Sequence, residues 1–203
     1  MDAPTLSSAS QQIAPPLFLG LSVLGLAVAR SDLKHRRIPN DYLLGGLLYA
    51  TAIFIFFTVP GGWKLTAQAL GFALLGMLMG MGLMAPALIY RQVAAGDVKF
   101  MMVIGYFLGP FGAIFALLNA ALIGGLWALW IAARSGGLGN VWRNLRFMGR
   151  SLWLSGFSRV GWDLSSAGAL RMPYGVALAL GAWLVIAWQL GRHPAVRGAL
   201  GLG

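Results

Sequence analysis

The amino-acid sequence predicts an all-α, polytopic membrane protein with about six transmembrane helices and with the N-terminus and C-terminus outside. Three observations indicate this fold class. Of the 203 residues, 59% are hydrophobic and only 10% are charged. The mean hydropathy is +0.77, a value typical of membrane proteins rather than of soluble domains. Several apolar runs also approach the roughly 20 helical residues needed to cross a hydrocarbon layer about 30 Å thick. We therefore interpret residues 1–203 as a single integral membrane domain.

The first half of the chain contains three of these apolar runs, which predict helices over residues 13–30, 42–59 and 65–90. Pro15-Pro16 is expected to mark the start of the first helix, and Asn40 is well placed to cap the second. The N-terminal segment lacks the positively charged region and the small-residue cleavage site of a secretory signal peptide. It is therefore retained as the first transmembrane helix.

The stretch from Val98 to Ala133 is almost entirely apolar, and as one helix it would be roughly 54 Å long. That length exceeds a single crossing. Gly109-Pro110 offers a break, because proline lacks a helical donor and disfavours helix in the residue before it. The sequence therefore predicts two helices here, over residues 98–109 and 110–133, and a further one over residues 172–190.

The distribution of basic residues supports this division. Two crossings place twelve Lys and Arg residues on the side of the first loop and three on the other, whereas one crossing would leave eight against seven. The positive-inside rule favours the asymmetric arrangement and predicts a cytoplasmic loop over residues 134–171. Within it, residues 140–154 carry apolar side chains on one helical face and three arginines on the other. An in-plane helix on anionic lipid and an ordinary solvated loop both remain open.

Composition excludes several kinds of chemistry. The chain has no cysteine and only two histidines, His35 and His193. Disulfide scaffolds, thiolate zinc sites, iron–sulfur clusters and cysteine nucleophiles are therefore excluded, and histidine catalysis is not expected. We expect no metal and no cofactor. The net charge of +10 reflects the cytoplasmic loops, where anionic lipid is an expected partner and nucleic acid is not.

All five acidic residues are aspartates, and an aspartate near a hydrophobic segment of a membrane protein is a functional candidate. Asp32 follows the first helix and precedes a basic turn and Ile38-Pro39-Asn40. Asp97 lies in Gly96-Asp97-Val98-Lys99, at the start of the fourth helix. Either motif alone is also compatible with a topological anchor or a surface ion pair. Together, two carboxylates on one membrane side form the minimum set for an aspartic protease, in which one acid is protonated and the other activates water.

These two motifs resemble those of the GxGD-type membrane aspartic peptidases, the type IV prepilin peptidases, in the short form found with tight-adherence (Tad/Flp) pilus systems. The first family motif is an aspartate followed by basic residues and Ile-Pro-Asn, and the second is Gly-x-Gly-Asp-x-Lys. The segment Met172-Pro173-Tyr174-Gly175 resembles a third family feature before the last helix. The resemblance implies catalytic Asp32 and Asp97, with Gly96, Lys99, Ile38, Pro39 and Asn40 as supporting motif residues.

The resemblance also implies a function, which is cleavage of the basic leader peptide from Flp-type prepilins at the cytoplasmic face of the bacterial inner membrane. The chain departs from the family pattern in two places. Ala94 replaces the first motif glycine, which weakens the argument for a tight turn. No cysteine-rich zinc insert is present, so we expect a peptidase without N-methyltransferase activity.

Two other classes of function remain open from the sequence. A small transporter could use the two aspartates to carry protons or to bind a cation. A non-catalytic membrane subunit of a pilus assembly could retain the fold alone. A protease requires both acids in contact with one water, whereas a transporter would distribute them along a pathway.

Overall fold

The computed structural model describes residues 6–90, 93–134, 139, 146 and 174–192, and all the regular secondary structure in this part of the chain is helical. Its elements are α1 (Leu6–His35), α2 (Asn40–Thr58), the short 3₁₀ helix η1 (Val59–Gly61), α3 (Trp63–Ile89), α4 (Ala95–Arg134) and α6 (Tyr174–Gly191). Five of these helices are long and apolar enough to cross a membrane. The predicted fold class, an all-α polytopic membrane protein, is therefore confirmed. Most of the predicted loop 134–171, with its amphipathic segment 140–154, lies outside the described residues.

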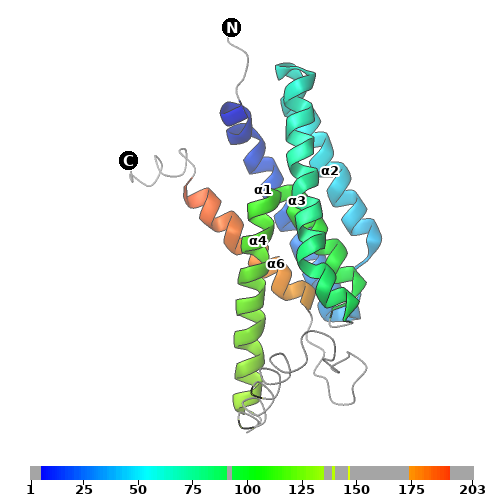
Figure 1. Ribbon diagram of the computed structural model, residues 1–203, viewed down its shortest axis with the longest axis vertical. Helices are drawn as coiled ribbons and strands as arrows, with labels where there is room; N and C mark the ends of the chain where they lie inside the picture. Colours follow the sequence, from blue (N-terminus) through cyan, green and yellow to red (C-terminus); the bar gives the residue numbers. More distant parts are fainter. Residues whose placement is uncertain (1–5, 91–92, 135–138, 140–145, 147–173, 193–203) are drawn as a thin grey trace.

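Helices α1, α2 and α3 run alternately down, up and down in Figure 1. The buried face of α1 follows the spacing of three or four residues that one side of a helix presents. This face consists of Ile13, Leu17, Leu21, Leu24 and Val28. It brings α1 against α2 and α6 and leaves the opposite face to the surroundings.

Pro15-Pro16 does not mark the start of the first helix, contrary to the sequence-based expectation. Helix α1 begins at Leu6 and contains both prolines in its interior. Prolines are tolerated inside membrane helices more readily than inside soluble ones. The Tyr49 hydroxyl donates to the Pro16 carbonyl at 2.9 Å and joins α2 to this part of α1. Gly20 leaves the space on α1 that the Tyr49 ring occupies.

Helix α4 reverses its direction at Gly109, where the sequence predicts a break. Gly109 has non-helical backbone angles, φ 73° and ψ −179°. Before this residue, Gly105 packs on Gly76 and Met101 on Gly80, an antiparallel register with α3. After it, Ala116 and Ala120 pack on Gly181 while Gly124 lies beside Ala177, an antiparallel register with α6. Figure 1 shows the first part of α4 rising beside α3 and the second part descending past the ends of the other helices.

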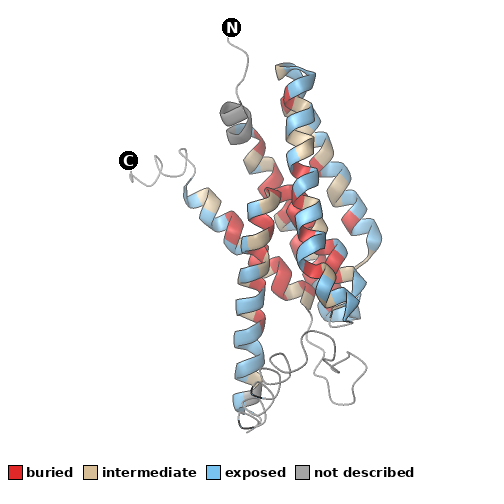
Figure 2. Cartoon of the chain, in the orientation of Figure 1, coloured by how far each residue is buried: buried red, intermediate tan, exposed pale blue. Residues whose placement is uncertain are grey.

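Glycines allow both parts of α4 to pack closely on their neighbours. A methyl group added to Gly76 would collide with the Gly105 carbonyl, and one added to Gly181 would collide with the Ala116 carbonyl. Small residues at such contacts let membrane helices approach closely enough for dispersion forces to hold them. The first part of α4 is consequently the centre of the bundle, where Phe100, Met101 and Ile104 are fully buried. Figure 2 shows buried residues concentrated where α1, α3, α4 and α6 meet.

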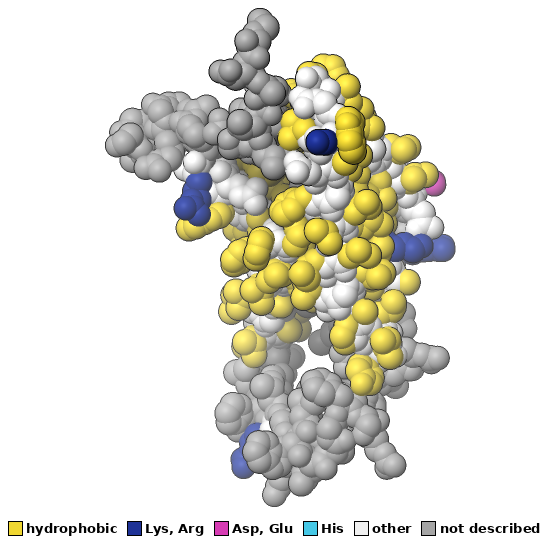
Figure 3. All heavy atoms as spheres, turned by 45° about the horizontal axis from the view of Figure 1, so that its top comes forward, with side chains coloured by type: hydrophobic (Ala, Val, Ile, Leu, Met, Phe, Trp, Pro, Cys, Tyr) yellow, Lys and Arg dark blue, Asp and Glu magenta, His cyan; other side chains and the backbone are white. Residues whose placement is uncertain are grey.

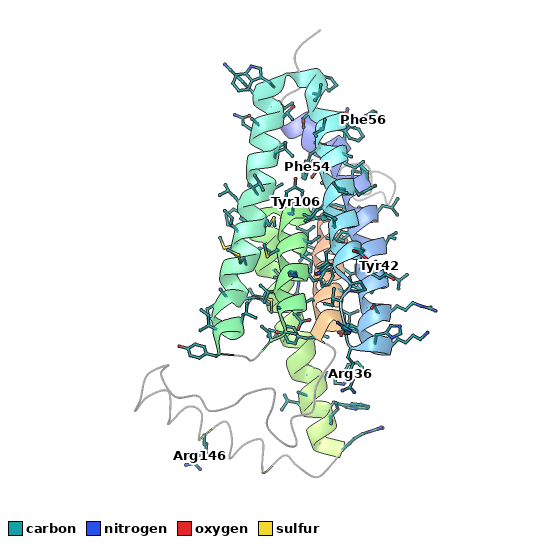
Figure 4. All side chains as sticks on the ribbon, turned by 90° about the vertical axis from the view of Figure 1, so that its right-hand side faces the viewer. Arg36, Tyr42, Phe54, Phe56, Tyr106 and Arg146 are labelled. Carbon is teal, nitrogen blue, oxygen red and sulfur yellow. The ribbon has the colours of Figure 1, made fainter. Side chains whose placement is uncertain are left out.

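One interhelical polar contact joins α2 to α4 above the centre of the bundle. The hydroxyl groups of Thr51 and Tyr106 lie 2.9 Å apart. The rings of Phe54 and Tyr106 also meet edge to face, with centroids 5.9 Å apart, and Figure 4 shows the two residues side by side between the helices. The outer surface is mainly hydrophobic on the face in Figure 3, as expected for helices surrounded by lipid.

Candidate active site

Asp32 lies in the last turn of α1 and is only 7% exposed. A buried carboxylate requires partners to replace the water that it has lost. The backbone N–H of Gly175, at the start of α6, donates to Asp32 Oδ2 at 2.9 Å. Residues separated by 143 positions thus meet at the lower end of the bundle. The free N–H groups of a helix N-terminus are suited to hold a negatively charged oxygen.

Asp97 lies in the first turn of α4 and is 8% exposed. The backbone N–H of Ala94 donates to Asp97 Oδ2 at 3.3 Å. This is the contact that the third helical residue makes in a capping box, where its side chain reaches back to the N-terminal backbone. The local fold of the second motif therefore fixes the carboxylate of Asp97 at the start of its own helix.

The structure also explains why alanine is tolerated at position 94. Among the described residues, the positive φ angles belong to Arg36, Gly62 and Gly109. Ala94 therefore has a backbone conformation that any residue adopts without strain. Its contribution to the site is a backbone N–H, which does not depend on the side chain.

The two aspartates come together although 65 positions separate them. Ile38 packs against Gly96, which precedes Asp97, and against Gly175, whose amide binds Asp32. Both carboxylates therefore lie at the same end of the bundle. The first two residues of α6 complete the arrangement: Gly175 bonds to Asp32, and the Tyr174 phenol is near enough to interact with the charge of Asp97.

Ile38 fills the space between the two motifs and α6. A methyl group added to Gly96 would lie 3.4 Å from Ile38 Cβ, and one added to Gly175 would lie 3.2 Å from Ile38 Cδ1. Gly96 and Gly175 thus let the Ile38 side chain pack against the starts of α4 and α6. Pro39 follows in extended conformation and directs the chain into α2.

The predicted capping role of Asn40 is wrong. Helix α2 begins at Asn40, its N-cap residue is Pro39, and no side chain bonds to the cap. The Asn40 amide oxygen instead accepts a hydrogen bond from Lys99 Nζ at 3.1 Å. This contact joins the first motif to the second, because a lysine two residues after Asp97 reaches across to the start of α2.

Sequence reasoning did not identify Ser31, Tyr174 and Gly175 as site residues. Ser31 is 9% exposed, and its hydroxyl donates to the Arg37 carbonyl at 2.8 Å. This bond secures the basic turn, in which Arg36 has the left-handed φ of 50° that is costly outside glycine. In the sequence, Ser31 could have been noticed because it directly precedes Asp32. Tyr174 and Gly175 belong to the segment before the last helix, which was noted as a family feature without a role in the site.

Two pockets flank the Ile38-Pro39-Asn40 segment, and Asn40 lines both. The first, of about 430 Å³, is lined by Ser31, His35, Arg37, Ile38, Pro39 and Asn40. The second, of about 190 Å³, lies between α2, α3 and α4 and is lined by Asn40, Leu43, Leu44, Leu47, Met77, Lys99, Met102 and Val103.

No cluster of three or more His, Cys, Asp or Glu side chains that could hold a metal occurs in the described ranges. Among the described residues, the buried ionisable side chains of this site are Asp32 and Asp97.

Comparison with known proteins gives one match. The model of the type IV leader peptidase family matches residues 18–129, more than half of the chain. This range contains both aspartates and ends before α6. No curated protein and no solved structure matches the chain significantly.

Proposed function

Because the chain belongs to the type IV leader peptidase family, we propose that Asp32 and Asp97 are the catalytic pair of a membrane aspartic endopeptidase acting on Flp-type prepilins. Family membership implies peptidase activity and a prepilin substrate. The proposal adds the mechanism, the class of pilin and the site of cleavage, which is the junction between the basic leader and the hydrophobic helix.

The observation that carries the proposal is that two buried carboxylates lie at the same end of the bundle, each bonded to a backbone amide at the start of a helix. An aspartic peptidase needs one ionised and one protonated carboxyl group around a single water. The ionised carboxylate takes a proton from this water, whose oxygen attacks the scissile carbonyl carbon. The protonated carboxyl group donates to the carbonyl oxygen, which gives a tetrahedral diol. Proton transfer to the peptide nitrogen then breaks the C–N bond and releases the leader as a carboxylic acid and the pilin as an amine.

The same geometry argues against a transporter. Acids that pass a proton or cation through a membrane are expected at successive levels of a pathway. Asp32 and Asp97 lie at one end of the bundle, held by the N-terminal amides of α6 and α4. A non-catalytic assembly subunit gives no reason for two buried carboxylates at one end of the bundle, each bonded to its own backbone amide.

We place the site at the cytoplasmic face of the bacterial inner membrane. Three exposed basic residues follow within five positions of Asp32, namely Lys34, Arg36 and Arg37. Figure 4 shows Arg36 at the lower end of α1. Basic residues at helix ends favour the cytoplasmic side and interact with anionic lipid headgroups. The proposal does not include N-methylation, because the chain has no cysteine for the zinc insert of the long family members.

The test is cleavage of a synthetic precursor with a short basic leader, a glycine and one apolar helix, followed by mass spectrometry. Asp32→Asn and Asp97→Asn are each expected to lower the rate by about 10²-fold to 10⁴-fold, because an amide cannot exchange the required proton. Asp41→Asn is the matched control: Asp41 is exposed at the start of α2, and this variant should cleave normally. Asp163→Asn should also remain active. Near-normal cleavage by either variant of the pair would remove that aspartate from the mechanism.

A further inference from the structure

The second pocket forms a groove that starts at the level of the catalytic pair. We call it the α2–α4 groove and define it by Asn40, Leu43, Leu44, Leu47, Met77, Lys99, Met102 and Val103. Its polar end is the hydrogen bond between Lys99 and Asn40. The remaining lining residues are apolar. From Asn40 to Leu47 the groove follows α2 for about 10 Å, at 1.5 Å per residue.

The groove begins beside the segment that packs between the two motifs. Asn40, which lines its polar end, directly follows Ile38-Pro39, and Ile38 packs against Gly96 and Gly175. Lys99 is two residues after Asp97 and points to the other side of α4, so a polypeptide with its scissile carbonyl at the aspartates would pass the Ile38-Pro39 segment to reach the groove. Leu44, at its edge, is 58% exposed, so the groove opens sideways to the lipid.

The size and lining of the groove favour a docked helix over a small molecule. Its volume of about 190 Å³ is below the roughly 300–1,000 Å³ of pockets that enclose small ligands. It is sufficient for apolar side chains that project from a helix lying alongside. Met77 and Met102 contribute flexible, polarisable walls, which adapt to side chains of different shape.

The first pocket suits a basic leader poorly, because its lining includes the cation of Arg37. Six of the eight residues that line the α2–α4 groove are apolar, against two of the six that line the first pocket. We therefore assign the hydrophobic side of the cleavage junction to the α2–α4 groove.

We propose that the α2–α4 groove binds the first two turns of the precursor's hydrophobic helix, immediately after the scissile bond. This inference rests on the proposed function. It makes Leu44, Leu47, Met77 and Met102 contacts for the substrate helix, and it means that the precursor enters laterally from the membrane. A lipid acyl chain is the competing occupant.

Disulfide crosslinking tests the position of the helix directly. The chain has no cysteine, so Leu44→Cys introduces a single thiol into the groove. Leu48→Cys is the matched control, because Leu48 is one turn away on α2, is 63% exposed and does not line the groove. Each variant is combined with Asp97→Asn and incubated, in membranes, with the synthetic precursor carrying one cysteine in the first two turns of its helix.

Crosslinking from position 44 at least fivefold above position 48 is the expected result. Equal crosslinking from both positions, or none from position 44, would overturn the inference and would favour lipid as the occupant. The failure of the proposed function would look different: wild-type protein would then leave the precursor uncut, and Asp97→Asn would change nothing.

A kinetic experiment provides a second readout. Leu44→Trp fills the groove and is expected to lower kcat/KM for the membrane-anchored precursor about tenfold, through KM. The same variant should cleave a short soluble peptide, which ends just after the scissile bond, at the wild-type rate. Leu48→Trp should cleave both substrates normally. If Leu44→Trp cleaved the precursor as well as the wild type, or lost both substrates equally, the groove would not be the docking site.

Discussion

At the scale of single residues, the position of Asp32 depends on a group from the far end of the chain. Its carboxylate is buried, and the hydrogen bond that holds it comes from the Gly175 amide. A side chain at position 175 would intrude on this contact, because an added methyl group would lie 2.9 Å from Asp32 Oδ2 and 3.2 Å from Asp32 Cγ. Gly175 therefore acts as a positioning residue for the proposed catalytic aspartate.

We expect Gly175→Ala to lower kcat by about 10²-fold while the protein still inserts and folds. The methyl group would displace the Asp32 carboxylate, and a displacement of about 1 Å in a reacting group costs roughly this factor. The measurement is single-turnover cleavage of the precursor at saturating enzyme. Gly82→Ala is the control, because a methyl group at Gly82 would meet no atom within 4 Å. If both variants cleaved at the wild-type rate, the Gly175 contact would have no part in positioning Asp32.

Sequence reasoning found most of the residues that meet at this site, but not what they contact. The two aspartates were identified because acids are scarce in this membrane chain, and Ile38, Asn40 and Lys99 followed from the motifs around them. Asn40 was assigned to its own helix, whereas its side chain bonds to Lys99. Gly175 was noted only as part of the segment before the last helix, and its contact with Asp32 could not be predicted because the two residues lie 143 positions apart.

At the scale of the elements, two proline-containing segments behave differently. Pro15-Pro16 lies within a continuous helix, whereas Pro110 follows a reversal of the chain. The difference lies in Gly109, whose φ of 73° is in the left-handed region. Proline removes one helical donor, but the turn itself requires a residue that adopts a left-handed backbone. The sequence therefore predicted the break correctly where glycine precedes proline, and wrongly predicted the start of the first helix at Pro15-Pro16.

Gly109→Ala is expected to destabilise the protein by about 1–3 kcal/mol, the range for a residue held in a disfavoured backbone conformation. A methyl group at this position would also collide with the Phe72 ring on α3. Thermal unfolding in detergent should show a lower midpoint temperature for this variant. Gly125→Ala, in the same helix and with no atom within 4 Å of the added methyl group, should unfold like the wild type. Equal midpoints for Gly109→Ala and Gly125→Ala would contradict this account of the turn.

At the scale of the whole molecule, the distribution of basic residues predicts its orientation in the membrane. The turn after α1 is basic and lies at the end of the bundle that holds both aspartates. The loop between α2 and α3 lies at the opposite end, as Figure 1 shows. Under the positive-inside rule the aspartate end faces the cytoplasm.

Single-cysteine labelling in intact cells checks this orientation. A membrane-impermeant maleimide should label Trp63→Cys, whose side chain is 76% exposed at the start of α3, and should leave Lys34→Cys unlabelled. Both variants should react after the cells are opened, which shows that each thiol is accessible. Labelling of Lys34→Cys in intact cells would place the aspartates on the outer side.

The bond between Asp32 and Gly175 also has a consequence for biosynthesis. A ribosome that adds roughly 5–20 residues per second needs on the order of 7–30 s to synthesise the 143 positions that separate the two residues. By the end of this interval α1, α2, α3 and α4 have been synthesised. The growing polypeptide then contains both aspartates but not yet the Gly175 amide that bonds to Asp32. Helix α6, which supplies this amide, is translated after α1 to α4, so the Asp32 carboxylate acquires its partner only once α6 has been synthesised.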